Sequence, residues 1–231
     1  MDKDFTIFQE KLGLDFNDQG LLRQAFVHRS YINENKQSGL SHNERLEFLG
    51  DAVLELVITD FLFAKYPDKA EGDLTAYRSA LVNATTCSDI ATRLGMNEYL
   101  LLSKGESKDM GRARQYILAN TLEAFIGAIY LDLGYESAKK FIETEFTPLI
   151  DGIISERTWI DSKSLFQEKA QEFDGVTPSY KTIKESGPDH EKKFTVGVYV
   201  GKELVATGEG DSKQDAEQAA ARAALSARGW N

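Results

Sequence analysis

The sequence of 231 residues has few of the residues that cross-link or interrupt a chain, with one cysteine, Cys87, and four prolines. A single cysteine excludes a disulfide framework and a cysteine-based zinc site, and it is typical of a reducing compartment. The N-terminus has no basic segment followed by an apolar one, so we expect no signal peptide. The most apolar stretch, 52–64, is interrupted by Glu55 and Asp60 and is too short to cross a bilayer. We therefore expect a soluble, cytoplasmic protein without a membrane partner.

Basic residues are in deficit as well. The chain has 27 Lys and Arg against 37 Asp and Glu, which gives a net charge of −10. This surplus of acid argues against nucleic acid as a partner, but a total cannot reveal a basic stripe on one face. With 42% apolar residues the composition excludes a disordered or fibrous chain, and the length suits one or two domains.

Residues 1–153 carry helical periodicity almost throughout, and no stretch alternates between apolar and polar residues as a strand does. The longer helices are predicted over about 41–65, 73–95, 112–131 and 136–146. This half is therefore predicted to be an all-α domain. We expect the short polar segment 154–160 to link it to a second domain.

Residues 161–231 show a different pattern. A short helix is predicted from 161 or 162 to about 173, and an alanine-rich helix is predicted over 213–227. Between them lie three stretches typical of strands, 179–185, 192–200 and 202–207. The order α-β-β-β-α predicts a small α+β domain, in which a three-stranded sheet carries both helices on one face.

Four carboxylates line one face of the first long predicted helix. At about 100° per residue, Glu47, Asp51 and Glu55 all fall within about 60° of Glu44. Gly50 is expected roughly opposite the acids, where a second helix could approach closely. The rest of the surface is apolar, so most of this helix is predicted to be buried, including Leu46, Phe48, Leu49, Val53, Leu54, Leu56 and Val57.

Clustered carboxylates beside apolar surface are unfavourable unless they are protonated, paired with basic side chains or bound to a cation. Oxygen ligands without cysteine favour Mg²⁺ over zinc. Asn120 and Glu123 share one face of a later predicted helix beside small residues, so this helix could bring Glu123 to the acidic stripe. One or two Mg²⁺ ions between the helices could then hold a water nucleophile and polarise a phosphodiester.

Ordinary structural roles compete with this interpretation. Ser41 and Glu44 have the spacing of a capping box, so closing the helix start is as good an account of Glu44 as catalysis. We expect Glu55 to pair with Lys or Arg from a neighbouring element. Metal binding is the preferred interpretation for Glu47 and Asp51, and spacing alone leaves the role of Glu123 open.

Four segments of the first half resemble motifs of the ribonuclease III family and occur in the family's order. They are AFVHRSY at 25–31, NERLEFLGD at 43–51, EGDLTAYRSALV at 71–82 and LEAFIGAIYLD at 122–132. The resemblance is to the bacterial form, with one nuclease domain and one RNA-binding domain. It implies a homodimeric, Mg²⁺-dependent endoribonuclease without an organic cofactor. Such an enzyme cuts double-stranded RNA in rRNA and mRNA processing, leaving 5′-phosphates and short 3′ overhangs.

By position, the resemblance implies Asp51 and Glu123 as catalytic residues and Glu44 and Glu71 as auxiliary acids. The implied metal ligands are Glu47, Asp51, Asn120 and Glu123. Asn120 stands where the family usually has Asp, and its carbonyl can ligate Mg²⁺ but brings no negative charge. We expect an active enzyme that needs more Mg²⁺ than its Asn120→Asp variant would. The alternative is a double-stranded-RNA-binding protein whose nuclease centre is impaired at Asn120.

The second half resembles a double-stranded-RNA-binding domain, which reads A-form RNA by shape across two minor grooves and the phosphates between them. The contact residues that this resemblance implies come from the first helix, the loop before the second strand and the start of the last helix. They are Gln167, Glu168, His190, Lys192, Lys213 and Gln214. A Mg²⁺-dependent nucleotide pyrophosphohydrolase would also have paired helical carboxylates, but it gives no reason for this domain.

Overall fold

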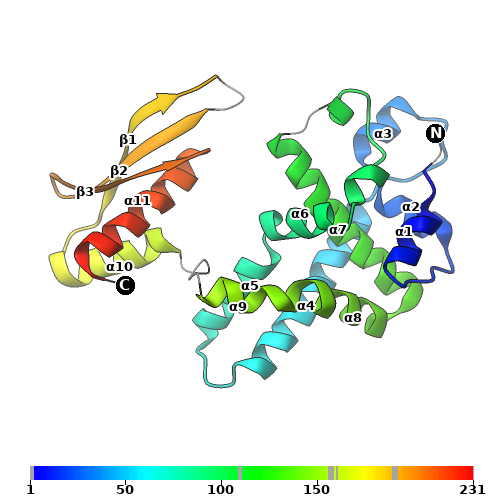
Figure 1. The fold of residues 1–231 in the computed structure, drawn as a ribbon, viewed down its shortest axis with the longest axis horizontal. Helices are drawn as coiled ribbons and strands as arrows, with labels where there is room; N and C mark the ends of the chain where they lie inside the picture. The colour runs from blue at the N-terminus through cyan, green and yellow to red at the C-terminus, as the bar shows by residue number, and fades with distance from the viewer. Residues whose placement is uncertain (1–2, 109–110, 156–158, 160, 189–191, 231) are drawn as a thin grey trace. The chain divides into compact units, whose positions relative to one another are not determined.

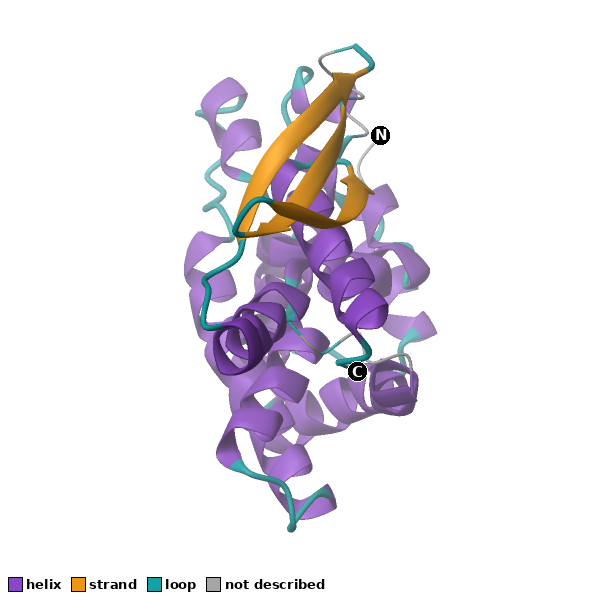
Figure 2. Cartoon of the chain, turned by 90° about the vertical axis from the view of Figure 1, so that its left-hand side faces the viewer, coloured by secondary structure: helices purple, strands orange, loops and turns teal. Residues whose placement is uncertain are grey.

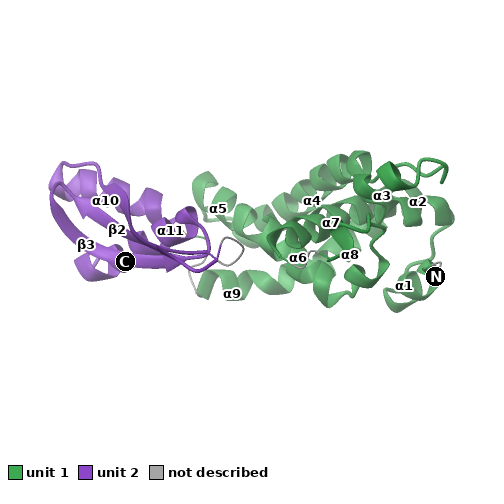
Figure 3. Ribbon diagram, turned by 90° about the horizontal axis from the view of Figure 1, so that it is seen from above, with its two compact units in different colours: residues 1–159 green, residues 160–231 purple. Residues whose placement is uncertain are grey.

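Two units make up the chain, Met1–Trp159 and Ile160–Asn231, and each is described by itself (Figure 3). The computed structural model describes residues 3–108, 111–155, 159, 161–188 and 192–230. Helix α9 (Ile150–Ser155) takes in the first two residues of the segment 154–160 that the sequence analysis assigns to a linker.

The described part of the first unit is helical, and the predicted all-α fold is confirmed (Figure 1). Short 3-10 turns and one isolated parallel bridge, between Val27 and Leu101, complete it. Its other helices are α1 (Phe5–Lys11), α2 (Gln19–Ala25), α3 (Arg29–Glu34), α4 (Glu44–Lys65), α5 (Glu71–Val82), α6 (Ala84–Arg93), α7 (Arg112–Leu133) and α8 (Tyr135–Phe146).

Helix α7 runs through the middle of this unit, where it packs on α2, α4, α6 and α8 (Figure 1). Most of its side chains are buried. Among the described residues it is the one helix whose length and hydropathy would allow it to cross a membrane. Its place inside the helical core accounts for that composition.

Helices α4 and α7 approach each other through glycine. A Cβ added to Gly50 of α4 would collide with the carbonyl oxygen of Glu123, and one added to Gly127 of α7 would collide with that of Leu46. The close approach expected at Gly50 is therefore confirmed. Its expected direction is wrong, because the helix that packs on Gly50 carries Glu123, and Glu123 interacts with the acids of α4.

The burial predicted for α4 is only partly correct. Leu46, Val53, Leu54 and Val57 are buried as expected. Phe48 and Leu56, which were predicted to be buried, are 80% and 57% exposed, and Phe63 further along the helix is 73% exposed. A large apolar side chain predicts burial, but the sequence does not show whether the same chain or another molecule buries it.

The helix predicted over 73–95 is in fact two helices, α5 and α6, which meet at Asn83. The backbone of Asn83 is extended, and its side-chain oxygen accepts a hydrogen bond from Thr86 N at 2.9 Å, which caps α6. Asparagine is a preferred N-cap residue because its side chain satisfies a free backbone N–H of the first turn. Asn83 is a possible N-cap in the sequence, but the helical periodicity continues on both sides of it and predicts one helix.

The second unit has the predicted α+β fold. It contains α10 (Ser162–Asp174), β1 (Ser179–Ser186), β2 (Lys193–Val200), β3 (Glu203–Gly210) and α11 (Lys213–Arg228). The strands form an antiparallel sheet in the order β1-β2-β3, with both helices on one side of it (Figures 1 and 2). A Cβ added to Gly208 of β3 would collide with the backbone at Ala220, so glycine and alanine bring α11 close to the sheet.

Candidate active site

Three carboxylates meet where α4 and α7 cross. Glu47 and Asp51 lie on α4, and the backbone of Glu123 on α7 lies against Gly50, between them in sequence. Burial raises the pKa of Glu123 to about 7, and the negative charges of Asp51 and Glu47 add to the rise. The two helices therefore bring these three acids together within electrostatic range of one another.

The two acids of α4 also have raised pKa values. Burial raises the pKa of Glu47, the charges of Glu44 and Asp51 add to the rise, and a hydrogen bond from Asn120 opposes it. Partial burial raises the pKa of Asp51, and the neighbouring charge of Glu55 adds to this. All three carboxyl groups are thus less acidic than in water, because each charge is partly desolvated and adjacent to others.

Asn120 belongs to this group through its hydrogen bond with Glu47. A carboxylate can only accept, so the amide nitrogen of Asn120 is the donor, and this leaves the amide oxygen available to another partner. The side chain thus supplies a neutral donor to one acid of the group.

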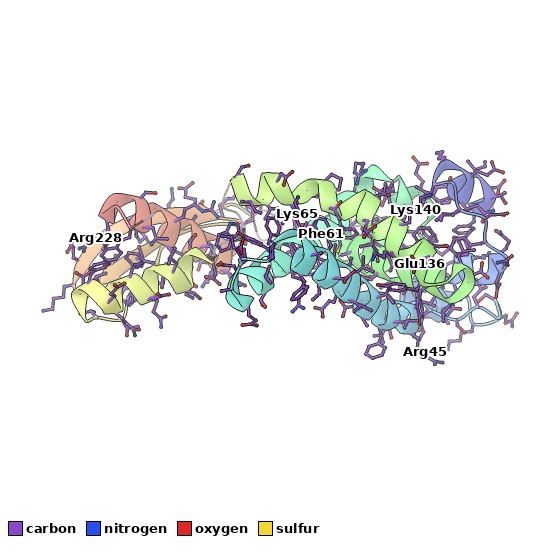
Figure 4. The ribbon with its side chains drawn as sticks, turned by 90° about the horizontal axis from the view of Figure 1, so that it is seen from below. Arg45, Phe61, Lys65, Glu136, Lys140 and Arg228 are labelled. Atoms are coloured by element: carbon purple, nitrogen blue, oxygen red, sulfur yellow. The ribbon has the colours of Figure 1, made fainter. Side chains whose placement is uncertain are left out.

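The basic side chains that the structure describes do not neutralise these acids. Among the residues that the structure describes, no Lys, Arg or His forms an ion pair with Glu47, Asp51 or Glu123. Arg45, close to them in sequence, extends away from α4 (Figure 4). The pairing expected between Glu55 and a Lys or Arg is also not found in the described part of the chain.

Carboxylate and amide oxygens are hard ligands, so the donor set fits Mg²⁺. Within the described residues no three acidic, histidine or thiol groups are placed to ligate one ion together. Binding of Mg²⁺ does not require three such groups, because Mg²⁺ usually keeps several waters and takes only one or two carboxylates from the protein. Zinc in a structural site would require four direct ligands.

Glu44 and Glu71, the auxiliary acids implied by the resemblance, are not members of this group, for different reasons. Glu44 begins α4 and pairs with Arg29 Nη1 at 3.4 Å and His42 Nδ1 at 3.7 Å. The proposed capping box with Ser41 is wrong, because Asn43 is the N-cap and makes no side-chain cap; it donates instead to Ala25 O at 3.0 Å.

Glu71 is not brought to the carboxylate group within one chain. It begins α5, after the turn that follows the C-terminal end of α4, whereas Glu47 lies in the first turn of α4. A helix of this length spans roughly 33 Å. The nearest partner of Glu71 is local, since Thr75 Oγ1 donates to its carboxylate at 3.2 Å.

Cys87 lies closer to the acids than the sequence indicated. It is buried in α6, and its thiol is in contact with Val82 O at 3.6 Å. Burial raises its pKa, and the charges of Glu123 and Asp51 add to the rise. The sequence analysis treated Cys87 as an ordinary buried thiol, because no spacing pattern connects α6 to α4 and α7.

In the second unit the predicted RNA contacts lie on separate elements. Gln167 and Glu168 are exposed on α10, and Lys213 and Gln214 are exposed at the start of α11. Lys192 directly precedes β2. Lys213 Nζ lies 5.6 Å from the centre of the Phe194 ring, and Glu185 pairs with both Lys192 and Lys213. His190 lies outside the described residues.

Comparison with protein families gives two matches that together cover most of the chain. The family described as "Ribonuclease-III-like" matches residues 18–150. The family described as "Double-stranded RNA binding motif" matches residues 162–227. The first match contains all the acids of α4, α5 and α7 considered above.

Curated relatives are similar along nearly the whole length. The chain is 46% identical to Ribonuclease 3 of Borreliella burgdorferi over 220 residues, which is 95% of this chain and 89% of that protein. It is 45% identical to Ribonuclease 3 of Carboxydothermus hydrogenoformans over 226 residues, 97% and 96% of the two chains.

Among solved structures, the nuclease domain of ribonuclease III from Campylobacter jejuni is similar to the first unit. It is 41% identical, covers 62% of this chain and 99% of that one, and superposes with a TM-score of 0.56. In that protein, structural flexibility was found in a region of the nuclease domain that is involved in dimer formation.

Proposed function

The chain belongs to the ribonuclease III family of endoribonucleases, and from this premise we propose that it cuts double-stranded RNA with Mg²⁺ bound between α4 and α7. The observation that carries this proposal is the group of Glu47, Asp51 and Glu123, with raised pKa values and no basic partner in the described chain. Such a group is electrostatically unfavourable alone, and a divalent cation would relieve it.

Glu47, Asp51 and Glu123 would surround the ion with the amide oxygen of Asn120, one or two of the carboxylates as direct ligands and the rest through the waters that Mg²⁺ keeps. When bound, Mg²⁺ supplies Lewis-acid polarisation of the phosphodiester and activation of water. Asp51 and Glu123 are the proposed catalytic residues. Glu123, the most deeply buried of the three, has a pKa of about 7, so it is partly protonated at neutral pH in the metal-free protein and would become ionised beside a cation. Asn120 orients the Glu47 carboxylate by donating to it.

The proposed reaction is hydrolysis, in which water adds to phosphorus and the bond from phosphorus to the 3′ oxygen breaks. The products would be 5′-phosphate ends and, from staggered cuts in two strands, short 3′ overhangs. We propose structured rRNA and mRNA precursors in the cytoplasm as substrates, as the bacterial-type domain arrangement implies.

We further propose a homodimer that forms through the exposed apolar face of α4. Phe48, Leu56 and Phe63 are large apolar side chains on this helix that the rest of the described chain leaves exposed. Burying such a patch in an interface is favourable at about 25 cal/mol per Å² of apolar surface. Glu44 and Glu71 are proposed auxiliary acids of the cleft, and the role of Glu71 requires the second subunit.

The second unit would bind the duplex through three contact points on one face. Gln167 and Glu168 of α10, the loop that contains His190, and the start of α11 provide them. The N-terminus of α11 adds free backbone N–H groups beside Lys213, which favour a phosphate. Lys192 lies next to this site through its pairing with Glu185.

A duplex-RNA assay over a range of Mg²⁺ concentrations tests the proposal. We expect the protein to shift a short RNA duplex on a gel without divalent metal and to cut it only when Mg²⁺ is added. A protein that retains the duplex but leaves it uncut at every Mg²⁺ concentration would instead be a double-stranded-RNA-binding protein impaired at Asn120.

A further inference from the structure

A cluster of three charged side chains joins the start of α11 to one end of the sheet in the second unit. The carboxylate of Glu185, in β1, pairs with Lys213 Nζ at 3.1 Å through one oxygen and with Lys192 Nζ at 3.2 Å through the other. Hydrogen bonds from Lys213 and Lys192 lower the pKa of Glu185, so the carboxylate is firmly ionised. One acid therefore holds two of the lysines that we propose as RNA contacts.

The register of the sheet places Glu185 on the face that α11 packs against. Glu185 lies opposite Phe194 of β2, and Phe194 lies opposite Gly210 of β3. Residues directly opposite one another project from the same face of a sheet. A Cβ added to Gly210 would collide with the backbone in the first turn of α11, so this face is the one that the helix covers. Lys213 extends over the Phe194 ring towards Glu185.

The arrangement matches the way two lysines hold a phosphodiester. Carboxylate and phosphate each offer two anionic oxygens to charged donors. The positive end of the α11 dipole favours an anion in the same place. With Glu185 between them, Lys192 and Lys213 leave one net positive charge to the cluster instead of two.

A further lysine at this end, Lys193, has a different acidic partner. Lys193 pairs with Asp211, but both side chains are largely exposed, at 64% and 74%, so solvent screens their attraction. Glu185 and Lys192 are 36% and 38% exposed, and Lys213 is 59% exposed. Solvent therefore screens the attraction between Glu185 and Lys192 less than that between Lys193 and Asp211.

We propose that Glu185 sets the affinity of this domain for duplex RNA by competing with an RNA phosphate for Lys192 and Lys213. The inference rests on the RNA-binding face proposed above. An approaching phosphate must displace Glu185 from the lysines or share them with it, and the charge of Glu185 repels the phosphate in either case. Removing that charge raises the net charge of the cluster by one and so strengthens its attraction for the RNA.

The test compares Glu185→Gln with the unsubstituted protein, both as full chains, in binding a short RNA duplex without divalent metal. Gln keeps the shape and removes the charge. Each phosphate that is neutralised releases counterions and steepens the salt dependence. We expect binding that is about three- to tenfold tighter at 50 mM salt, with a slope of log K against log salt that is steeper by about one. The gain should shrink about three- to fourfold by 200 mM salt.

Glu203→Gln is the matched control. Glu203 begins β3 at the opposite end of that strand from Gly210 and pairs with Arg228 Nη2 at 3.3 Å. Glu203→Gln removes the same charge from the unit, but far from Lys192 and Lys213. We therefore expect less than about a twofold change in affinity and no change in slope. An equal gain in both variants, or no gain in Glu185→Gln, overturns the competition. Glu185→Ser is a second variant in case Gln lowers the melting temperature.

Lys213→Ala separates this inference from the proposed RNA-binding face. Weaker binding by Lys213→Ala, together with a smaller gain from Glu185→Gln in the Lys213→Ala background, supports both. Weaker binding by Lys213→Ala with no effect of Glu185→Gln overturns the competition alone. Unchanged binding by Lys213→Ala overturns the binding face and the inference with it.

Discussion

The carboxylates of the two proposed sites, one in each unit, lie in opposite electrostatic surroundings. In the first unit, Glu47, Asp51 and Glu123 lie together with raised pKa values and without a basic partner among the described residues. In the second unit, Glu185 holds two lysines and has a lowered pKa, and Glu217 pairs with Lys163 Nζ at 2.6 Å.

This difference explains how a chain with a net charge of −10 can suit both a cation and an anionic polymer. Acids without partners create a local negative potential that a divalent ion can relieve. Two lysines that share one carboxylate, as Lys192 and Lys213 share Glu185, retain a local positive potential that phosphate can use. The sign of the total charge is therefore a poor guide to either site, because each ligand responds to charges within about 10 Å.

The largest expected effect comes from removing Glu123, the most buried of the three acids at the α4–α7 crossing. Glu123→Ala should reduce cleavage of duplex RNA by about a thousandfold, because groups that stabilise charge in the transition state contribute on this scale. Duplex binding without metal should be unchanged, since the second unit provides it. Glu136→Ala, which removes an exposed acid of α8 (Figure 4), is the control and should cut normally. Equal loss of binding and cleavage would contradict the division of labour between the units.

A substitution at the helix crossing tests whether close packing positions the acids. Gly50→Ala should destabilise the first unit by roughly 3 kcal/mol and lower its Tm by about 6–12 °C, because the added methyl group collides with the backbone at Glu123. Gly72→Ala adds the same methyl group to α5, where nothing lies within 4 Å, and should leave the Tm unchanged or slightly higher. Calorimetry of the two variants checks this, and similar Tm values would disprove the tight crossing.

The raised pKa of Glu123 predicts how the stability of the metal-free protein depends on pH. The folded group titrates near 7 and the unfolded one near 4.5, so between these values the folded state binds more protons. Stability from this group is highest below pH 4.5, falls as pH rises and reaches its low plateau above about 7. The loss should be about 2 kcal/mol after allowance for partial exposure.

Denaturant unfolding of the unsubstituted protein and of Glu123→Gln, measured from pH 4.5 to 8 in a chelator, isolates this contribution. The difference between the two proteins should change across that interval, whereas a parallel pair of curves would show that Glu123 titrates normally. Addition of Mg²⁺ at pH 8 should restore stability to the unsubstituted protein. The Gln variant should regain stability only in part or not at all.

The smallest expected effect concerns Asn120. Asn120→Asp replaces the donor to Glu47 with another negative charge, so the metal-free protein should lose about 1 kcal/mol of stability. The Mg²⁺ midpoint for cleavage should fall by roughly three- to tenfold, because ligand charge raises metal affinity. Titrations of the two proteins compare these midpoints, and identical values would remove the argument that Asn120 weakens Mg²⁺ binding.

Much of the fold follows from local patterns. Helical periodicity predicted α4 and α7, and alternation with glycine turns predicted the three strands of the second unit. The placing of Glu47 and Asp51 on one helical face follows from 100° per residue alone. The break at Asn83 was not predicted, because the helical spacing of apolar residues continues through it and a single capping residue does not alter that spacing.

Other features depend on contacts between distant segments. The exposure of Phe48 and Leu56 was not predictable, because hydrophobicity is the same whether the cover comes from this chain or another. The pairing of Glu185 with Lys213 joins residues on β1 and α11, and no spacing rule reaches across a sheet register. Only the packing of α6 on α7 brings Cys87 within electrostatic range of Glu123.

The sequence by itself determined which residues form helices and strands, which acids share a helical face, and the family whose motifs the chain carries. Those properties arise from interactions within a few residues, so they can be read in order along the chain. Only the tertiary structure decided which charges meet and which remain without a basic partner. Electrostatic interactions depend on distance in space, and the folded backbone brings α4 to α7 and β1 to α11.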